Sequence, residues 1–125
     1  GPGGDVLQSI DGGPAVQVAG GPDSDASDNR PSVTHDGRTI FWDSTRFGTL
    51  GGPDLFYATR SNTSEQWGTA THLGSINSAG FDARPFISWD GRYLTFSSNR
   101  GGSEGPGPAF APDMWYVTRE GVNRN

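Results

Sequence analysis

The sequence predicts an all-β fold on three observations. The apolar residues fall into short runs of about five to seven, which is the length of strands. No stretch has the three-and-four spacing of an amphipathic helix, and no apolar run is long enough to cross a membrane. Although 20 of the 125 residues are Gly and 9 are Pro, 11% are aromatic, which favours a folded chain over a disordered one.

Composition excludes several kinds of function. The formal charge is -5, and all nine basic residues are Arg. This acidic balance argues against nucleic-acid binding, which needs a basic surface to contact phosphates. The absence of Cys excludes disulfides and thiolate metal sites. Gly1-Pro2-Gly3 has the form of a cloning scar, so the sequence alone leaves the compartment undetermined.

An internal repeat spans most of the chain. Residues 30–46 align without a gap on residues 84–100, at an offset of 54 residues. Asp54–Arg60 then matches Asp113–Arg119 at an offset of 59, so the second copy carries five extra residues between 101 and 112. Units of roughly 40–50 residues with several short strands are typical of β-propeller blades.

Turn chemistry divides each repeat into strands. Asp36-Gly37 and Asp90-Gly91 lie between β-rich runs and predict two-residue hairpin turns, in which Gly supplies the positive φ. A starting Pro is acceptable because the first N–H of a strand need not join a ladder. The expected strands are Pro31–His35, Thr39–Asp43, Leu55–Thr59 and Ala70–Leu73 in the first copy, and Pro85–Trp89, Tyr93–Ser97 and Met114–Thr118 in the second.

A spare outer strand is expected before the first copy, because Ala15–Gly20 aligns on Thr69–Gly74. The chain therefore holds the strands of two four-stranded antiparallel blades, permuted by one, so that the last blade lacks its outer strand. The predicted organisation is a flexible segment 1–14, a two-blade unit 15–119 and a tail 120–125. Within the unit, residues 15–29 form the outer strand and linker, 30–73 the first blade and 74–119 the second.

These motifs resemble the WD-like β-propeller repeat of TolB-type proteins. The resemblance rests on Phe86–Gly102, on Asp113–Val117 and on the preceding Leu73–Ser78, and it covers roughly residues 15–119 twice over. It implies a propeller, often of six blades, that acts through protein or ligand contacts. It also implies a location outside the cytoplasm, periplasmic or secreted.

The repeated Asp-x-Arg-Pro motif supplies the candidate ligand-binding residues Asp28, Arg30, Asp82 and Arg84. Placed just before the innermost strands, these charges would lie near the mouth of a propeller channel. A ring of Arg could bind an anionic or peptide-like ligand through its planar donor fork. The alternative, which the repetition favours, is that the charges fasten one blade to the next.

Other sites are weaker candidates. Asp23–Asp28 has carboxylates at alternate positions but lacks the Gly and the bidentate Glu of a calcium loop. Trp42 and Trp115 are expected in the core, whereas Trp67 and Trp89 leave open a carbohydrate-binding function, as a lectin or as part of a propeller glycosidase. His35 and His72 stand in no catalytic motif, so we expect no enzyme, no cofactor and no metal.

The sequence thus favours a non-catalytic binding or scaffold module that assembles with itself. Two blades alone would expose apolar faces, expected to carry Ile40, Trp42, Phe56, Leu94, Phe96 and Trp115. Head-to-tail repetition would cover them, and we expect a trimer with six blades, the alternative being a tetramer with eight. Val16 and Val18 of one copy would pair with Met114 and Tyr116 of its neighbour, and this pairing is called the latch below.

Overall fold

The described residues of the chain form three antiparallel sheets, none of them closed. The structure is a computed structural model that describes residues 5–9, 12–46, 49, 52–100 and 113–118. The N-terminal sheet pairs β1 (Leu7–Gln8) with β2 (Val16–Gln17). The central sheet has the order β3 (Asp28–Val33), β4 (Thr39–Ser44), β5 (Asp54–Thr59), β6 (Thr71–His72). The C-terminal sheet has the order β7 (Asp82–Ile87), β8 (Tyr93–Ser98), β9 (Asp113–Thr118).

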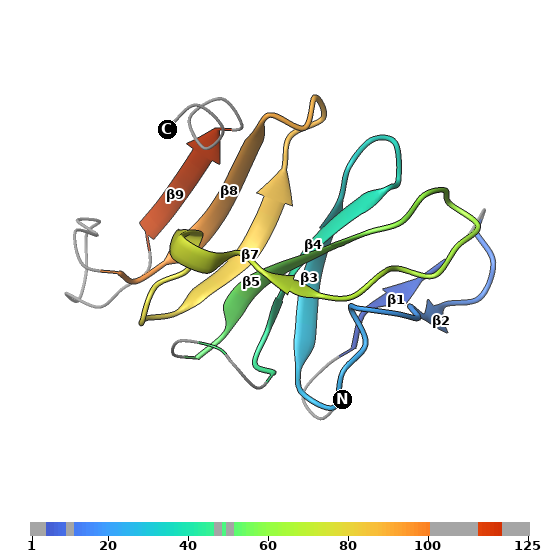
Figure 1. Cartoon of the computed structure of the whole chain (residues 1–125), viewed down its shortest axis with the longest axis horizontal. Coiled ribbons are helices and arrows are strands. Elements are labelled where there is room, and N and C mark those ends of the chain that lie inside the picture. The colour runs from blue at the N-terminus through green and yellow to red at the C-terminus, as the bar shows by residue number, and fades with distance from the viewer. Residues whose placement is uncertain (1–4, 10–11, 47–48, 50–51, 101–112, 119–125) are drawn as a thin grey trace.

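The central sheet lies between the other two (Figure 1). A short 3₁₀ helix, Gly74–Ile76, joins it to the C-terminal sheet. This architecture confirms the all-β class that the sequence predicts. The expected second and third strands differ from the observed ones by one added residue at one end. The five extra residues of the second copy and the tail 120–125 lie outside the described residues.

The first strand of each repeat begins three residues earlier than the sequence predicts. The sequence suggested Pro31–His35 and Pro85–Trp89, whereas β3 and β7 begin at Asp28 and Asp82. The reason is a β-bulge, at which the pairing of β3 with β4 passes from Asn29↔Asp43 to Ser32↔Phe41. Arg30 adopts a left-handed φ of 53° there, and Arg84 adopts 56° in β7. The bulge takes Pro out of the ladder, so Pro need not mark the start of a strand.

The prediction of two-residue hairpin turns was also wrong, because the turns are longer. The Thr34 N–H donates to the Thr39 carbonyl at 3.0 Å, and the Gly37 N–H donates to the Thr34 carbonyl at 2.9 Å. The turn therefore centres on His35 and Asp36, and Gly37 follows it in the left-handed region, with φ of 73°. Gly91 repeats this geometry with φ of 74°. The predicted positive φ at both glycines is confirmed, but four residues, not two, lie between the hydrogen-bonded residues Thr34 and Thr39, and likewise between Ser88 and Tyr93.

The expectation of exposed outer faces was wrong for five of the six residues named. Ile40, Trp42, Phe56, Leu94 and Phe96 are buried in the single chain, and Trp115 is half-buried. On the central sheet the first three of these residues pack in one cluster with Val6, Val18, Ala58 and Trp67. The N-terminal sheet and the loop before β6 supply the cover that a second copy was expected to give.

The N-terminal sheet contains a strand that the sequence did not predict. β1 lies within residues 1–14 and pairs with β2 in the register Leu7↔Gln17 and Gln8↔Val16. The chain beyond β2 lies against the central sheet, where Gly20 forms a parallel bridge with Trp67. A Cβ on Gly20 would lie 2.0 Å from the Trp67 carbonyl oxygen, so only glycine permits this approach.

Replacing the turn glycine tests this hairpin. Gly91→Val should lower the free energy of unfolding by more than about 1 kcal/mol, because a β-branched residue resists the left-handed region. Chemical denaturation monitored by tryptophan fluorescence measures the change. Gly52→Val is the control, since no atom lies within 4 Å of a Cβ built there. Equal losses in the two variants would contradict the assigned turn.

Candidate functional site

Asp28, the first residue of the repeated motif, is the centre of a buried network. Its carboxylate has no exposed surface. Ser24 donates to Oδ2 through its backbone N–H at 3.0 Å and its hydroxyl at 2.7 Å. Ser44 donates to Oδ1 at 2.7 Å, and Arg46 Nη2 lies 2.8 Å from the same oxygen. These contacts join the loop before β3 to the end of β4, so the carboxylate is fully engaged inside the chain.

The second repeat builds the same network around Asp82. Ser78 donates to Oδ2 through its N–H at 2.7 Å and its hydroxyl at 2.9 Å. Ser98 and Arg100 Nη2 lie 2.7 and 3.0 Å from Oδ1. Asp82 is likewise fully buried. The structure therefore places two of the four predicted ligand-binding residues in structural networks, away from solvent.

Arg46 and Arg100 are functional side chains that the sequence analysis did not single out. The Arg46 guanidinium lies over the rings of Trp42 and Phe56, at 5.2 and 5.0 Å from their centroids. Arg100 lies over Phe96 and Trp115 at 5.1 and 5.2 Å. These cation–π contacts tie the second strand of each repeat to the third. The signal was present in the aligned Ser-x-Arg ends of residues 44–46 and 98–100.

Asp43 joins the central and C-terminal sheets. Arg30 Nη1 donates to Asp43 Oδ1 at 3.1 Å, and the backbone N–H of Arg84 donates to Oδ2 at 2.9 Å. A second bond between the sheets runs from the Ile87 N–H to the Ser32 hydroxyl oxygen at 3.0 Å. The two predicted arginines thus meet at one carboxylate, Arg30 through its side chain and Arg84 through its backbone. The Arg84 side chain is exposed, with its guanidinium 5.8 Å from the Phe81 ring centroid.

Burial and hydrogen bonding shift the pKa values of these aspartates in opposite directions. Burial alone would raise the pKa of Asp28, but the donors Ser24, Ser44 and Arg46 outweigh it and lower that pKa. Burial dominates at Asp43 and raises its pKa, against the opposing effect of the Arg84 N–H and Arg30. The ionised form of Asp28 therefore stabilises the fold, whereas ionised Asp43 carries a net cost of burial.

The latch residues fall into two groups. Val18 is buried in the cluster on the central sheet, and β2 pairs with β1 of its own chain. Val16, Met114 and Tyr116 are exposed. Met114 and Tyr116 share the outward face of the C-terminal sheet with Phe86 and Tyr93, all four about half exposed or more. Within the described residues β9 pairs only with β8.

A cleft lies between the hairpin tips of the two repeats. Trp89 is 76% exposed, and its ring centroid is 3.8 Å from that of His35. The cleft measures about 240 Å³ and is lined by Thr34, Thr39, Gly91, Asp36 and Asp90 together with the two rings. Hydrogen bonds from Thr34 and Ser88 lower the pKa values of Asp36 and Asp90, so both carboxylates are ionised near neutral pH. An open aromatic face beside polar groups suits a ligand with both apolar and hydroxyl surfaces.

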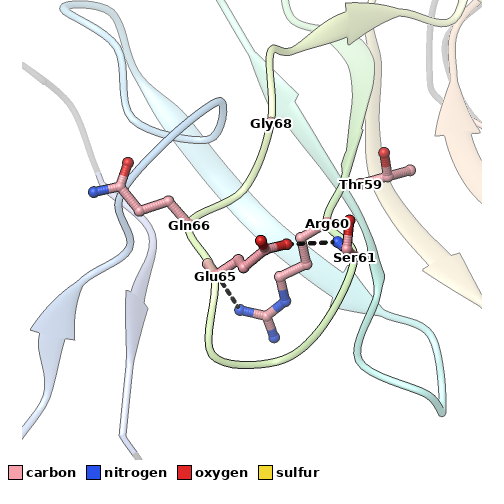
Figure 2. Close-up of a pocket in the computed structure, with 6 residues that line it drawn as sticks. All are labelled: Thr59, Arg60, Ser61, Glu65, Gln66 and Gly68. Atoms are coloured by element: carbon pink, nitrogen blue, oxygen red, sulfur yellow. Dashed lines mark hydrogen bonds between the residues drawn. The ribbon is translucent and has the colours of Figure 1, made fainter.

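A larger pocket of about 610 Å³ lies at the loop between β5 and β6 (Figure 2). Its basic residue, Arg60, lies 3.9 Å from the Trp67 ring centroid and donates to the Gly37 and Glu65 carbonyls at 2.8 and 3.3 Å. Ser61 fixes the Glu65 carboxylate through its N–H at 3.0 Å. These groups therefore hold the loop in shape. Trp67 is buried beneath Arg60, which leaves Trp89 as the exposed member of the two tryptophans considered for sugar binding.

No protein-family model matches the chain, and no curated protein matches it. Among the described residues, no group of three or more acidic or histidine side chains is arranged to hold a metal ion. No helix in that part of the chain has the length and apolarity to cross a membrane.

Asp28→Asn should lower the free energy of unfolding by about 3 kcal/mol at pH 7, because Arg46 then lacks its buried counter-ion. Asp25→Asn, at an exposed position of the same loop, is the control. Because the pKa of Asp28 is lowered by folding, its contribution is present above the unfolded value of about 3.9 and is lost as pH falls through the folded value. The difference between Asp28→Asn and the parent chain should therefore shrink on acidification below about pH 4. A difference that stays constant with pH would contradict the assigned role.

Proposed function

We propose that the chain is a non-catalytic binding or scaffold module, whose two repeats are blades of a β-propeller completed by further copies of the chain. The observation that carries this proposal is the repeated way in which successive sheets pack. The C-terminal sheet contacts the face of the central sheet that holds Asp43 and Ser32. The N-terminal sheet covers the opposite face, which holds Trp42 and Phe56.

The two packing steps place equivalent residues at equivalent positions. Val6, just before β1, packs on the central sheet, and Leu55, its counterpart in β5, is buried on the face toward the C-terminal sheet. Sheets that pack in one sense around their first strands are the arrangement of propeller blades. The next blade of the propeller would pack on the exposed outward face of the C-terminal sheet.

The proposed ligand is a protein segment or a small molecule that carries an anionic group. Arg30 and Arg84 occupy the same position of successive first strands, and both are exposed beside a left-handed bulge. Arg30 is partly engaged by Asp43, so Arg84 offers the freer guanidinium to an anion. Asp28 and Asp82 serve this site indirectly, because their networks fix the strands that carry the arginines.

A second candidate function, carbohydrate binding, is favoured by one observation. Trp89 exposes most of its ring in the cleft between the hairpin tips, where a sugar ring could stack on it. The hydroxyl of Thr34 and the carboxylates of Asp36 and Asp90 line the same cleft. The two candidate functions use different residues, so they can be tested in parallel.

Light scattering after size-exclusion chromatography tests the assembly. We expect the mass of a closed ring, either three or four chains of 13.2 kDa. The exposed apolar face of the C-terminal sheet would drive association, because a soluble monomer rarely leaves such a patch uncovered. The charge-reversing control Asp25→Arg, on an exposed loop, should leave the mass unchanged. A stable monomer across the concentration range would contradict the proposal.

Two substitutions separate the two binding functions. Arg84→Ala should weaken binding of inorganic phosphate by at least about tenfold, as expected for loss of a charge-assisted contact. Trp89→Ala should leave that affinity unchanged, and should remove any signal that the parent chain gives on a glycan array. Titration calorimetry and the array provide the two measurements, and each variant is the control for the other. Unchanged phosphate affinity in Arg84→Ala would overturn the anion site.

A further inference from the structure

The N-terminal hairpin is a second copy of the hairpin formed by β5 and β6. Its register, Leu7↔Gln17 and Gln8↔Val16, matches Phe56↔His72 and Tyr57↔Thr71. The Val18 N–H donates to the Val6 carbonyl at 3.0 Å, just as the Leu73 N–H donates to the Leu55 carbonyl at 3.1 Å. β1 is therefore a strand of the third type in the repeat, and β2 is of the fourth type. This register makes Val16 equivalent to Thr71, one residue further along than the sequence alignment of 15–20 on 69–74 gave.

β9 is also a strand of the third type. Asp113-Met114-Trp115-Tyr116 aligns with Asp54-Leu55-Phe56-Tyr57 and with Asp5-Val6-Leu7-Gln8. β5 holds a fourth-type strand, β6, along its edge, and β1 holds β2. Within the described residues, β9 has no strand on that edge. The chain thus contains three third-type strands and two fourth-type strands among its described elements.

We propose that a second copy of the chain completes the C-terminal sheet with its own β2, and that β1 of that copy leaves β2 to make room. This inference rests on the proposed assembly and specifies its interface. The intermolecular register follows from the repeat: Tyr57↔Thr71 becomes Tyr116↔Val16, and Phe56↔His72 becomes Trp115↔Gln17.

The exchange replaces each contact that it removes. Val6 leaves the cluster on the central sheet, and Met114 of the neighbour, which occupies the same repeat position, enters it. Met114 is 69% exposed before the exchange and has a flexible side chain suited to an existing cavity. The outward residues Phe86, Tyr93 and Tyr116 become covered at the same step. Exchange of equivalent elements between copies is a low-cost route to association, because the same bonds form on both sides.

The order of the receiving strand favours exchange. β1 contributes two ladder positions to β2. β9 is already ordered over six positions by its pairing with β8, so a neighbour's β2 meets a preformed edge. In the unassembled chain, β1 covers the apolar face of the central sheet and shields the edge of β2. β1 therefore acts as a removable cover for the assembly surface.

Pairs of cysteines can trap the two states, because the chain has no native Cys. Both variants of the full chain carry Val16→Cys. With Gln8→Cys, oxidation locks β2 to β1, since these two residues pair directly. With Tyr116→Cys, oxidation should link β2 to β9 of another chain. Val16→Cys with Tyr93→Cys is the mismatched control, because Tyr93 lies on β8.

We expect the oxidised Gln8→Cys/Val16→Cys chain to remain at 13.2 kDa by light scattering, and reduction to restore the assembled mass. The Val16→Cys/Tyr116→Cys chain should give covalently linked chains on a denaturing gel, at least about tenfold more than the mismatched control, as expected for a register-specific contact. If the locked chain assembles as well as its reduced form, the exchange is overturned while the proposed assembly stands. If the chain assembles but no disulfide forms between positions 16 and 116, the exchange is likewise overturned and the proposed assembly stands. If the parent and all reduced variants stay monomeric, both the exchange and the assembly fail.

Discussion

The buried carboxylates of Asp28 and Asp82 are the interaction on which the rest of the structure depends. Each one collects donors from the preceding loop, from the end of the second strand and from an arginine that lies over aromatic rings of the second and third strands. A buried charge is costly unless it is fully hydrogen-bonded, so the carboxylate permits one arrangement of these three segments. The network thereby holds the start of the first strand beside the end of the second.

Repetition and alternation in the sequence were sufficient to predict the second and third strands, because apolar runs such as Thr39–Asp43 and Leu55–Thr59 carry a clear strand signal. The start of the first strand was misplaced because a left-handed Arg before Pro, at Arg30 and Arg84, is a bulge that propensity does not reveal. β1 was missed because two ladder residues, Leu7 and Gln8, give no period to detect.

The candidate site, too, could be predicted from the sequence only in part. The repeat identified Asp-x-Arg-Pro as a special motif, and both copies do occupy special positions. The sequence could not tell which charges are buried, because burial depends on partners that are distant along the chain, such as Ser44 and Arg46 for Asp28. For the same reason the apolar faces were expected to be exposed: Val6, which covers the central sheet, lies just before β1, a strand that no sequence pattern predicts.

Because the sheets are covered unequally, their local stability also differs. Among the described residues, the central sheet is covered on both faces, whereas the C-terminal sheet is covered on one and has no strand beside the outer edge of β9. Local opening requires less free energy where fewer apolar contacts are lost and where backbone bonds already face water. Amide protons of β4 should therefore open only with the whole fold, while those of β9 open in smaller fluctuations. The strand that would receive a neighbour is thus held less firmly in the isolated chain than the strands of the central sheet.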